Sequence, residues 1–353
     1  MRPGRVAKIL IMVVLIVLVV RLVPLGTLAH TMATADPVLL LVAVGMVLGD
    51  RALMIAKWYP LLRVQVTCIS LWRAARAYLA AGFASLVLPA SLGADLLRAV
   101  ALGREDGVVT EIGASIAMER MLGMVASGVP TLLALAIVLW KDISLGVLLP
   151  WALASLAVAV IALLLPLSRG AMSLVDRLLG RHRNGKWGSL AHRFATAYTV
   201  YRRSPRMLAY VALASMLEQF VPVLVQWIVS RALGTSISLT MLLVAVPLAL
   251  FITRLPLTVA GLGVGEAAEV YTLALFGVPP VQSLALALTS RVVELVGLLP
   301  GAFLWYDLVA APRRRILRDA HGGDAIDRGP AEESAAGVAP VIPADAPSAP
   351  PPG

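Results

Sequence analysis

The feature that most constrains this chain is a pair of apolar segments that are interrupted in the same way. In the first, Pro89 and Gly93 break an apolar run just before Asp95. In the second, Pro256 and a glycine-rich stretch break a run just before Glu266. Within a bilayer, irregular backbone and charged side chains persist only where they are buried in protein or line a cavity. Matching breaks in the two halves of a chain are typical of transporter-type binding sites.

The composition places the chain in a membrane and excludes several classes of function. Of its 353 residues, 59% are hydrophobic and 14% are charged, whereas soluble domains carry about 25% charged residues. We therefore predict an all-α, polytopic membrane protein. The single cysteine, Cys68, excludes an internal disulfide, and the scattered histidines predict no metal site and no cofactor. The sequence contains no Ser/His/Asp set, nucleotide-binding loop or large soluble loop, so we predict that it is not an enzyme.

Apolar runs of about 20 residues predict about eight membrane spans, together with one or two re-entrant or broken helices. The predicted spans lie near Val6–Leu28, Pro37–Ala56, Val108–Leu139, Leu145–Leu167, Met207–Val229, Ile237–Thr253, Leu255–Phe276 and Val281–Ala310. The run Ala77–Leu88 is too short to cross a bilayer comfortably, at about 12 residues. We interpret it as the first arm of a re-entrant hairpin that enters from the cytoplasm and bends at Pro89–Gly93.

The basic residues predict the orientation. Residues 168–206 form a basic loop that holds most of the net charge of +10, and a basic loop beside membrane spans is typical of the cytoplasmic side. We predict a multi-pass protein of the cell inner membrane with both termini in the cytoplasm. Aromatic residues in this loop recur at helical spacing, which fits either an amphipathic helix on the leaflet or a connector packed on the bundle. Because no soluble domain presents the charge, nucleic acid is not an expected partner.

The chain divides into a membrane domain, residues 1–310, and a tail, residues 311–353. The tail is rich in Ala, Pro, Gly and acidic residues, so it is predicted to be disordered. Within the membrane domain, the second interrupted segment has two interpretations. It is a mirror image of the first hairpin, which makes the halves an inverted repeat, or it consists of two full spans. The sequence leaves both open.

The first half supplies a set of candidate site residues. Ser91 is placed to cap a helix whose positive N-terminal end suits a phosphate. Asp95 and Arg98 are three residues apart, so they share a helix face and are expected to pair. Glu119 and Arg120 are adjacent, point in different directions and are not expected to pair with each other. Arg120 instead suits Asp95 or a lipid phosphate.

The second half supplies a matching set. The glycines after Pro256 allow backbone amides to approach a ligand or another helix. Arg291 and Glu294 are expected to pair on one face, and Glu218 is a further candidate. The predicted path for a lipid head group or other substrate comprises Pro89, Ser91, Gly93, Asp95, Arg98, Glu119, Arg120, Arg254, Pro256, Gly261, Gly263, Gly265, Glu266, Arg291 and Glu294.

In these motifs the chain resembles the flippase-like membrane region of the lysylphosphatidylglycerol synthase family, in a stand-alone form without an aminoacyl-transfer domain. The matching pieces are the stretch from Leu88 to Arg98, Glu119-Arg120-x-x-Gly123, the stretch from Pro256 to Glu266, Gly277-Val278-Pro279 and Arg291. The resemblance implies lipid translocation or a membrane partner for lipid-linked sugar metabolism.

Two functions follow as expectations. The first is a flippase or transporter of an anionic phospholipid or a polyprenyl phosphate, which binds the head group at the broken helices. The second is a non-transporting scaffold for a membrane or cytoplasmic glycosyltransferase or another lipid-modifying enzyme. In the second case the basic loop and the tail would be the contact surface.

Overall fold

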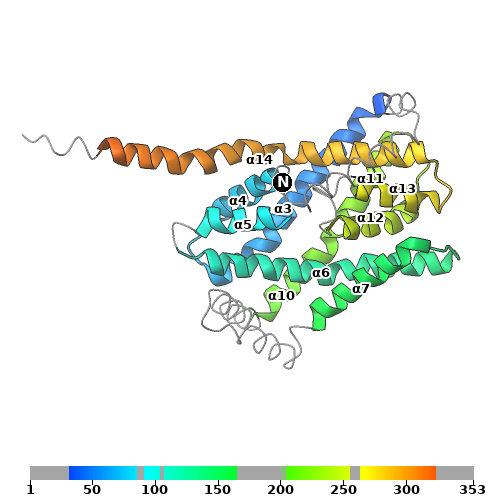
Figure 1. The fold of residues 1–353 in the computed structure, drawn as a ribbon, viewed down its shortest axis with the longest axis horizontal. Helices are drawn as coiled ribbons and strands as arrows, with labels where there is room; N and C mark the ends of the chain where they lie inside the picture. Colours follow the sequence, from blue (N-terminus) through cyan, green and yellow to red (C-terminus); the bar gives the residue numbers. More distant parts are fainter. Residues whose placement is uncertain are drawn as a thin grey trace, which may run out of the picture. The chain divides into compact units, whose positions relative to one another are not determined.

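Figure 1 shows the computed structural model, which describes residues 32–85, 91–103, 107–164, 201, 204–254 and 263–322. Across these ranges the regular structure is helical and contains no strand. The predicted class, a polytopic helical membrane protein, is confirmed. The chain divides into two units, residues 1–308 and 309–353, and the features below belong to the first.

Within the described ranges, five helical stretches are long and apolar enough to cross a membrane. They are α3 (Pro37–Gln65), α6 (Val109–Trp140), the stretch of η1 (Gly146–Leu148) and α7 (Leu149–Leu164), the stretch of α10 (Pro205–Glu218) and α11 (Val221–Ala232), and the first part of α14 (Pro280–Gly322). Each matches a predicted span. The predicted span near Val6–Leu28 lies outside the described residues.

Helix α3 is longer than the sequence predicts. Asp36 caps its start by accepting a hydrogen bond from the Val38 amide at 2.8 Å. The prediction ended this span at Ala56 because Lys57 follows, yet the helix continues to Gln65. Lys57 is buried, and its ammonium lies 2.9 Å from the Glu218 carboxylate on α10. A buried charge is tolerated when a partner of opposite sign accompanies it, so Lys57 does not end the span.

Both interrupted segments consist of two short helices that pack against each other. In the first half these are α4 (Leu71–Ala84) and α5 (Ser91–Gly103), and in the second half α12 (Leu239–Arg254) and α13 (Val264–Ala274). At 1.5 Å per residue they measure about 16–24 Å, less than the roughly 30 Å of a hydrocarbon core. These lengths favour the re-entrant interpretation over two full spans. The bends themselves, residues 86–90 and 255–262, lie outside the described residues.

The two halves repeat with a nearly constant offset. Helix α6 begins at Val109 and α14 begins at Pro280, 171 positions later. Asp95 and Glu266 are separated by the same 171 positions. In the same order, α3 corresponds to α10–α11, α4 to α12, and α5 to α13. The repeat that was suggested by two broken segments therefore extends over four consecutive elements.

The corresponding helices run in opposite directions. At one end, the Asp36 amide before α3 donates to the carbonyl of Ala232, the last residue of α11, at 2.8 Å. At the other end, the buried Tyr201 hydroxyl donates to the Leu61 carbonyl at 3.1 Å. Helix α3 is thus antiparallel to α10–α11. Figure 1 shows the same relation for the last pair, since α6 starts beside α5 and α14 starts beside α13 and returns the opposite way. The repeat is inverted.

Two predicted segments, the basic loop and the C-terminal tail, lie only partly within the described residues. Of the basic loop, residues 168–206, the structure describes positions 201 and 204–206, and Tyr201 packs against α3 as a connector on the bundle would. Helix α14 continues to Gly322, beyond residue 310 where the sequence places the end of the membrane domain. The disorder predicted for residues 323–353 concerns residues outside the described part.

Close packing between the halves leads to a stability prediction. A Cβ added at Gly301 on α14 would collide with the carbonyl oxygen of Leu79 on α4. Gly301→Ala is expected to destabilise the fold by about 1–3 kcal/mol, because backbone cannot move aside easily. Thermal unfolding in detergent measures this. The matched control is Gly45→Ala in α3, where a Cβ meets nothing within 4 Å. Equal unfolding temperatures for the two variants would contradict the proposed contact.

Candidate functional site: two carboxylate–arginine clusters

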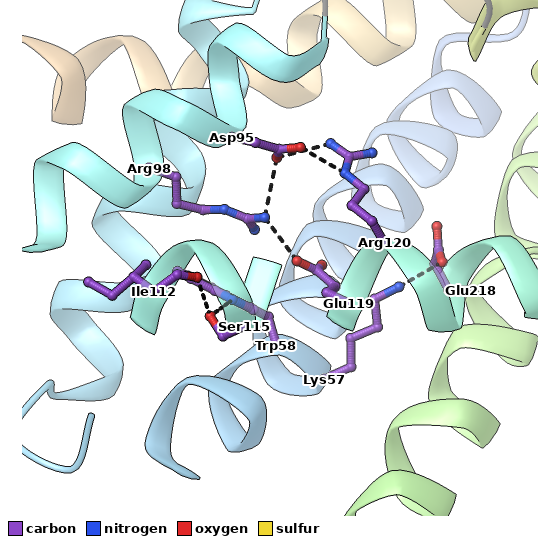
Figure 2. A network of polar contacts seen from close by, with 9 residues as sticks. All are labelled: Lys57, Trp58, Asp95, Arg98, Ile112, Ser115, Glu119, Arg120 and Glu218. Atoms are coloured by element: carbon purple, nitrogen blue, oxygen red, sulfur yellow. Dashed lines mark hydrogen bonds and ion pairs between the residues drawn. The ribbon is translucent and has the colours of Figure 1, made fainter. Parts of the chain in front are cut away.

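The first cluster joins the re-entrant hairpin to the long helix after it (Figure 2). Asp95 on α5 accepts two hydrogen bonds from Arg120 on α6, from Nε at 2.9 Å and from a terminal nitrogen at 3.0 Å. Both donors of one planar guanidinium engage both carboxylate oxygens, which is the strongest geometry for such a pair. Arg98, one turn along α5, donates to Asp95 at 3.3 Å and to Glu119 at 2.9 Å. Glu119 and Arg120 thus have separate partners.

Arg98 is held in a closed environment. It is 3% exposed, and its guanidinium carbon lies 4.2 Å from the Trp58 ring centroid and 4.9 Å from that of Tyr78. Trp58 is fixed in turn because its indole N–H donates to the Ser115 hydroxyl at 3.0 Å. Aromatic faces and carboxylates both stabilise a guanidinium. Arg98 is therefore a structural cation that orients Asp95 and Glu119.

Arg120 differs from Arg98 in the exposure of its side chain. Its side chain is 50% exposed, against 4% for Arg98. Arg120 lies eleven positions after the start of α6, or about 16 Å along the helix, within a helix that is long and apolar enough to cross a membrane. A guanidinium that is paired on one side and accessible on the other can accept a second anion without breaking the support beneath it.

The second cluster has the same arrangement in the second half. Arg291 on α14 donates to one oxygen of Glu266 on α13, from Nε at 3.3 Å and a terminal nitrogen at 3.1 Å. The other oxygen of Glu266 accepts the Gly263 amide at 2.8 Å. Arg291 also meets Glu294 at 3.4 Å, and its side chain is 30% exposed. Gly263 is the N-cap residue just before α13 and has a φ of 84°, a conformation that glycine tolerates best.

The two clusters correspond position by position. Asp95 and Arg120 are 25 residues apart, as are Glu266 and Arg291. Arg291 lies eleven positions after the start of α14, as Arg120 does in α6. The inverted repeat therefore places two equivalent carboxylate–arginine pairs at matching depths, one in each half.

The correspondence ends at one pair of positions. Arg98 and Glu119 of the first half correspond to Glu269 and Ser290 of the second, at the same offset of 171. In the first half the two side chains form a buried ion pair. In the second half both side chains are buried, and neither the Ser290 hydroxyl nor one carboxylate oxygen of Glu269 has a hydrogen-bond partner in the described structure.

Charged residues of α3 act electrostatically on groups of both clusters. Arg51 acts electrostatically on Tyr78 beside the first cluster and on Glu294 of the second. Asp50 neighbours Arg51 at 4.0 Å and is also close to Glu218 and Glu294.

The structure places the charged residues of the predicted site, except Arg254, in these clusters. Asp95, Arg98, Glu119 and Arg120 meet in the first, as Glu266, Arg291 and Glu294 do in the second. The pairings Asp95–Arg98, Asp95–Arg120 and Arg291–Glu294 are confirmed. Gly93 lies in α5 and Gly265 in α13, where a Cβ on Gly265 would collide with the Thr253 side chain. Ser91 begins α5 and Arg254 ends α12, while Pro89, Pro256 and Gly261 lie outside the described residues.

Comparison with known families gave a match over most of the chain. The family model described as the lysylphosphatidylglycerol synthase TM region matches residues 5–301, which include both hairpins and both clusters. The chain belongs to this family. Searches of curated proteins and of solved structures found no significant match.

Membership in the lysylphosphatidylglycerol synthase TM family makes this a membrane protein linked to lipid handling. Three features of its site were not predicted from the sequence: the Lys57–Glu218 pair, the aromatic pocket of Arg98, and Glu269. The equal 25-residue spacing within the two halves was the available signal for Glu269, since it aligns Glu269 with Arg98.

Proposed function

We propose that the protein translocates a lipid with an anionic head group, either an anionic phospholipid or a polyprenyl phosphate. The observation that carries the proposal is the pair of partly exposed guanidinium groups of Arg120 and Arg291, held by carboxylates at equivalent depths of an inverted repeat. Arginine recognises phosphate with two parallel hydrogen bonds. The role is non-enzymatic, in the cell inner membrane, with both termini in the cytoplasm.

The geometry suggests how a phosphate could bind while each displaced carboxylate keeps a hydrogen-bond donor. When a phosphate replaces Asp95 on Arg120, Asp95 still has Arg98 as a partner at 3.3 Å. When one replaces Glu266 on Arg291, Glu266 still accepts the Gly263 amide. Because an unpaired charge at membrane depth is costly, these secondary partners lower the barrier to exchange. Two sites related by an inverted repeat suit alternating access from the two leaflets.

Translocation in proteoliposomes tests the proposal. Vesicles with the purified protein are expected to move fluorescent anionic phospholipid or polyprenyl phosphate between leaflets faster than empty vesicles. Arg120→Ala and Arg291→Ala are each expected to slow this by about 10–100-fold, the effect of losing a hydrogen bond to a charged group. The matched control is Arg231→Ala, an exposed arginine that stacks on Trp227 at the end of α11. Failure of the wild-type protein to move any of these lipids, or rates for Arg120→Ala and Arg291→Ala that equal the control, would contradict the proposal.

The scaffold alternative depends on the basic loop and the tail, which lie almost wholly outside the described residues. A glycosyltransferase or lipid-modifying partner therefore stays a second proposal. A partner that co-purifies only when both segments are intact would support it.

A further inference from the structure

Glu269 differs from the carboxylates of the arginine clusters because it is buried without an ion-pair partner among the described residues. It lies on α13, one turn after Glu266, and is 4% exposed. Among the described residues no cation lies within salt-bridge distance of it, whereas Glu119, Glu218, Glu266 and Glu294 all have one. A buried carboxylate without a counter-charge is strongly disfavoured, so the environment of Glu269 favours its neutral form.

The hydrogen-bond partners of Glu269 point to the same state. The Gln226 amide nitrogen on α11 donates to one oxygen of Glu269 at 3.1 Å. The other oxygen of Glu269 is buried without a donor, and so is the carbonyl oxygen of the Gln226 side chain. Both oxygens are acceptors without a hydrogen-bond donor. They belong to two side chains that are already hydrogen-bonded to each other.

One proton satisfies both acceptors. A carboxylic acid and a primary amide form two parallel hydrogen bonds, in which the amide N–H donates to the acid carbonyl and the acid O–H donates to the amide carbonyl. The structure contains the first of these bonds. A proton on the second oxygen of Glu269 supplies the donor for the other, and it removes the buried charge in the same step.

We propose that Glu269 is a proton-binding site within the membrane domain. The charged groups acting on it are Glu266 on its own helix and Arg291 and Glu294 on α14, while α11 contributes the neutral Gln226. Glu269 is thus electrostatically connected to the second arginine site. When Arg291 exchanges Glu266 for a bound phosphate, the field on Glu269 changes, so head-group binding and proton binding are linked.

This linkage rests on the proposed transport function and would couple lipid movement to a proton gradient. Proton binding itself does not depend on that function. Glu269 takes up one proton from water and releases the same proton to water, with no covalent bond made or broken in the protein besides O–H. In the first half the equivalent position is the cation Arg98, so this proton site has no counterpart at that position.

Infrared spectroscopy of the reconstituted wild-type protein tests proton binding directly. We expect the carbonyl stretch of a protonated carboxylic acid at neutral pH, lost in Glu269→Gln and retained in Glu119→Gln, whose carboxylate is ion-paired in the wild type. Glutamine matches the shape of the protonated acid and can donate to Gln226, so the variant is expected to fold. The absence of an acid band in the wild type, or a band that is unchanged in Glu269→Gln, would overturn the proposal.

The coupling is tested separately in proteoliposomes under an imposed pH gradient. The rate of anionic lipid movement in the wild type is expected to depend on the gradient, and that of Glu269→Gln to be indifferent to it. Equal responses of the two proteins would refute the coupling. If the wild type moves no lipid, the transport function fails, and the infrared result still decides whether Glu269 binds a proton.

Discussion

Replacing Arg98 with methionine is expected to lower the free energy of unfolding by about 3–5 kcal/mol, because breaking a buried ion pair leaves an uncompensated charge. Arg98 is 3% exposed and contacts Glu119 at 2.9 Å, so its loss strands that carboxylate inside the bundle. Asp95 is less affected because it keeps Arg120. Equilibrium unfolding in mixed micelles of a mild and a denaturing detergent measures the change.

The double variant Arg98→Met with Glu119→Leu distinguishes a stranded charge from lost packing. Apolar residues in place of both partners remove the charge together with its counter-ion, and such replacements are often neutral. The double variant is therefore expected to be more stable than Arg98→Met alone. The control is Arg63→Met. Arg63 is exposed, and the hydrogen bond described for its side chain goes to the Tyr59 hydroxyl at 3.2 Å. Its loss should change the free energy of unfolding by less than about 0.5 kcal/mol. A double variant as unstable as Arg98→Met would show that the ion pair is not what Arg98 contributes.

The second prediction with a large expected effect concerns which side of the membrane each of two corresponding loops faces. In an inverted repeat, corresponding loops face opposite compartments. Cys68 lies in the loop between α3 and α4, and Ser236 lies in the corresponding loop between α11 and α12; both are exposed. Antiparallel packing of α3 on α10–α11 places these two loops at opposite ends of the helices. We therefore expect a membrane-impermeant maleimide to label a cysteine at each position from one side of the membrane only. The labelled side should differ between positions 68 and 236.

The sequence predicts the elements that are determined by local sequence patterns. Apolar runs identified the long helices, and the Pro/Gly breaks located both interrupted segments, because these patterns act within a few turns of chain. For the second segment the sequence left a hairpin and two full spans open. Side chains at helical spacing, such as Asp95 with Arg98 and Arg291 with Glu294, were paired correctly for the same reason. The adjacent Glu119 and Arg120 were rightly given separate partners.

Contacts between distant segments were harder to predict. Lys57 was taken to end a span because its partner, Glu218, is 161 residues away, and that pairing depends on α3 packing antiparallel to α10. The Arg98–Glu119 and Glu266–Arg291 pairs depend on how each hairpin folds back on the following helix. The repeat could have indicated Glu266–Arg291 in advance, since this pair has the same 25-residue spacing as Asp95–Arg120. Arg98–Glu119 has no counterpart in the second half, so the repeat gave no signal for it.

The central claim is that the two halves form an inverted repeat with one carboxylate–arginine site each, and the sidedness of the two loops tests it most directly. Cys68 is the single cysteine of the chain, so the wild type reports one loop and Cys68→Ser with Ser236→Cys reports the other. In intact cells and inverted vesicles, a membrane-impermeant maleimide is predicted to label Cys68 from the cytoplasmic side and position 236 from the opposite side. Labelling of both positions from the same side would contradict the inverted repeat and the transport model built on it.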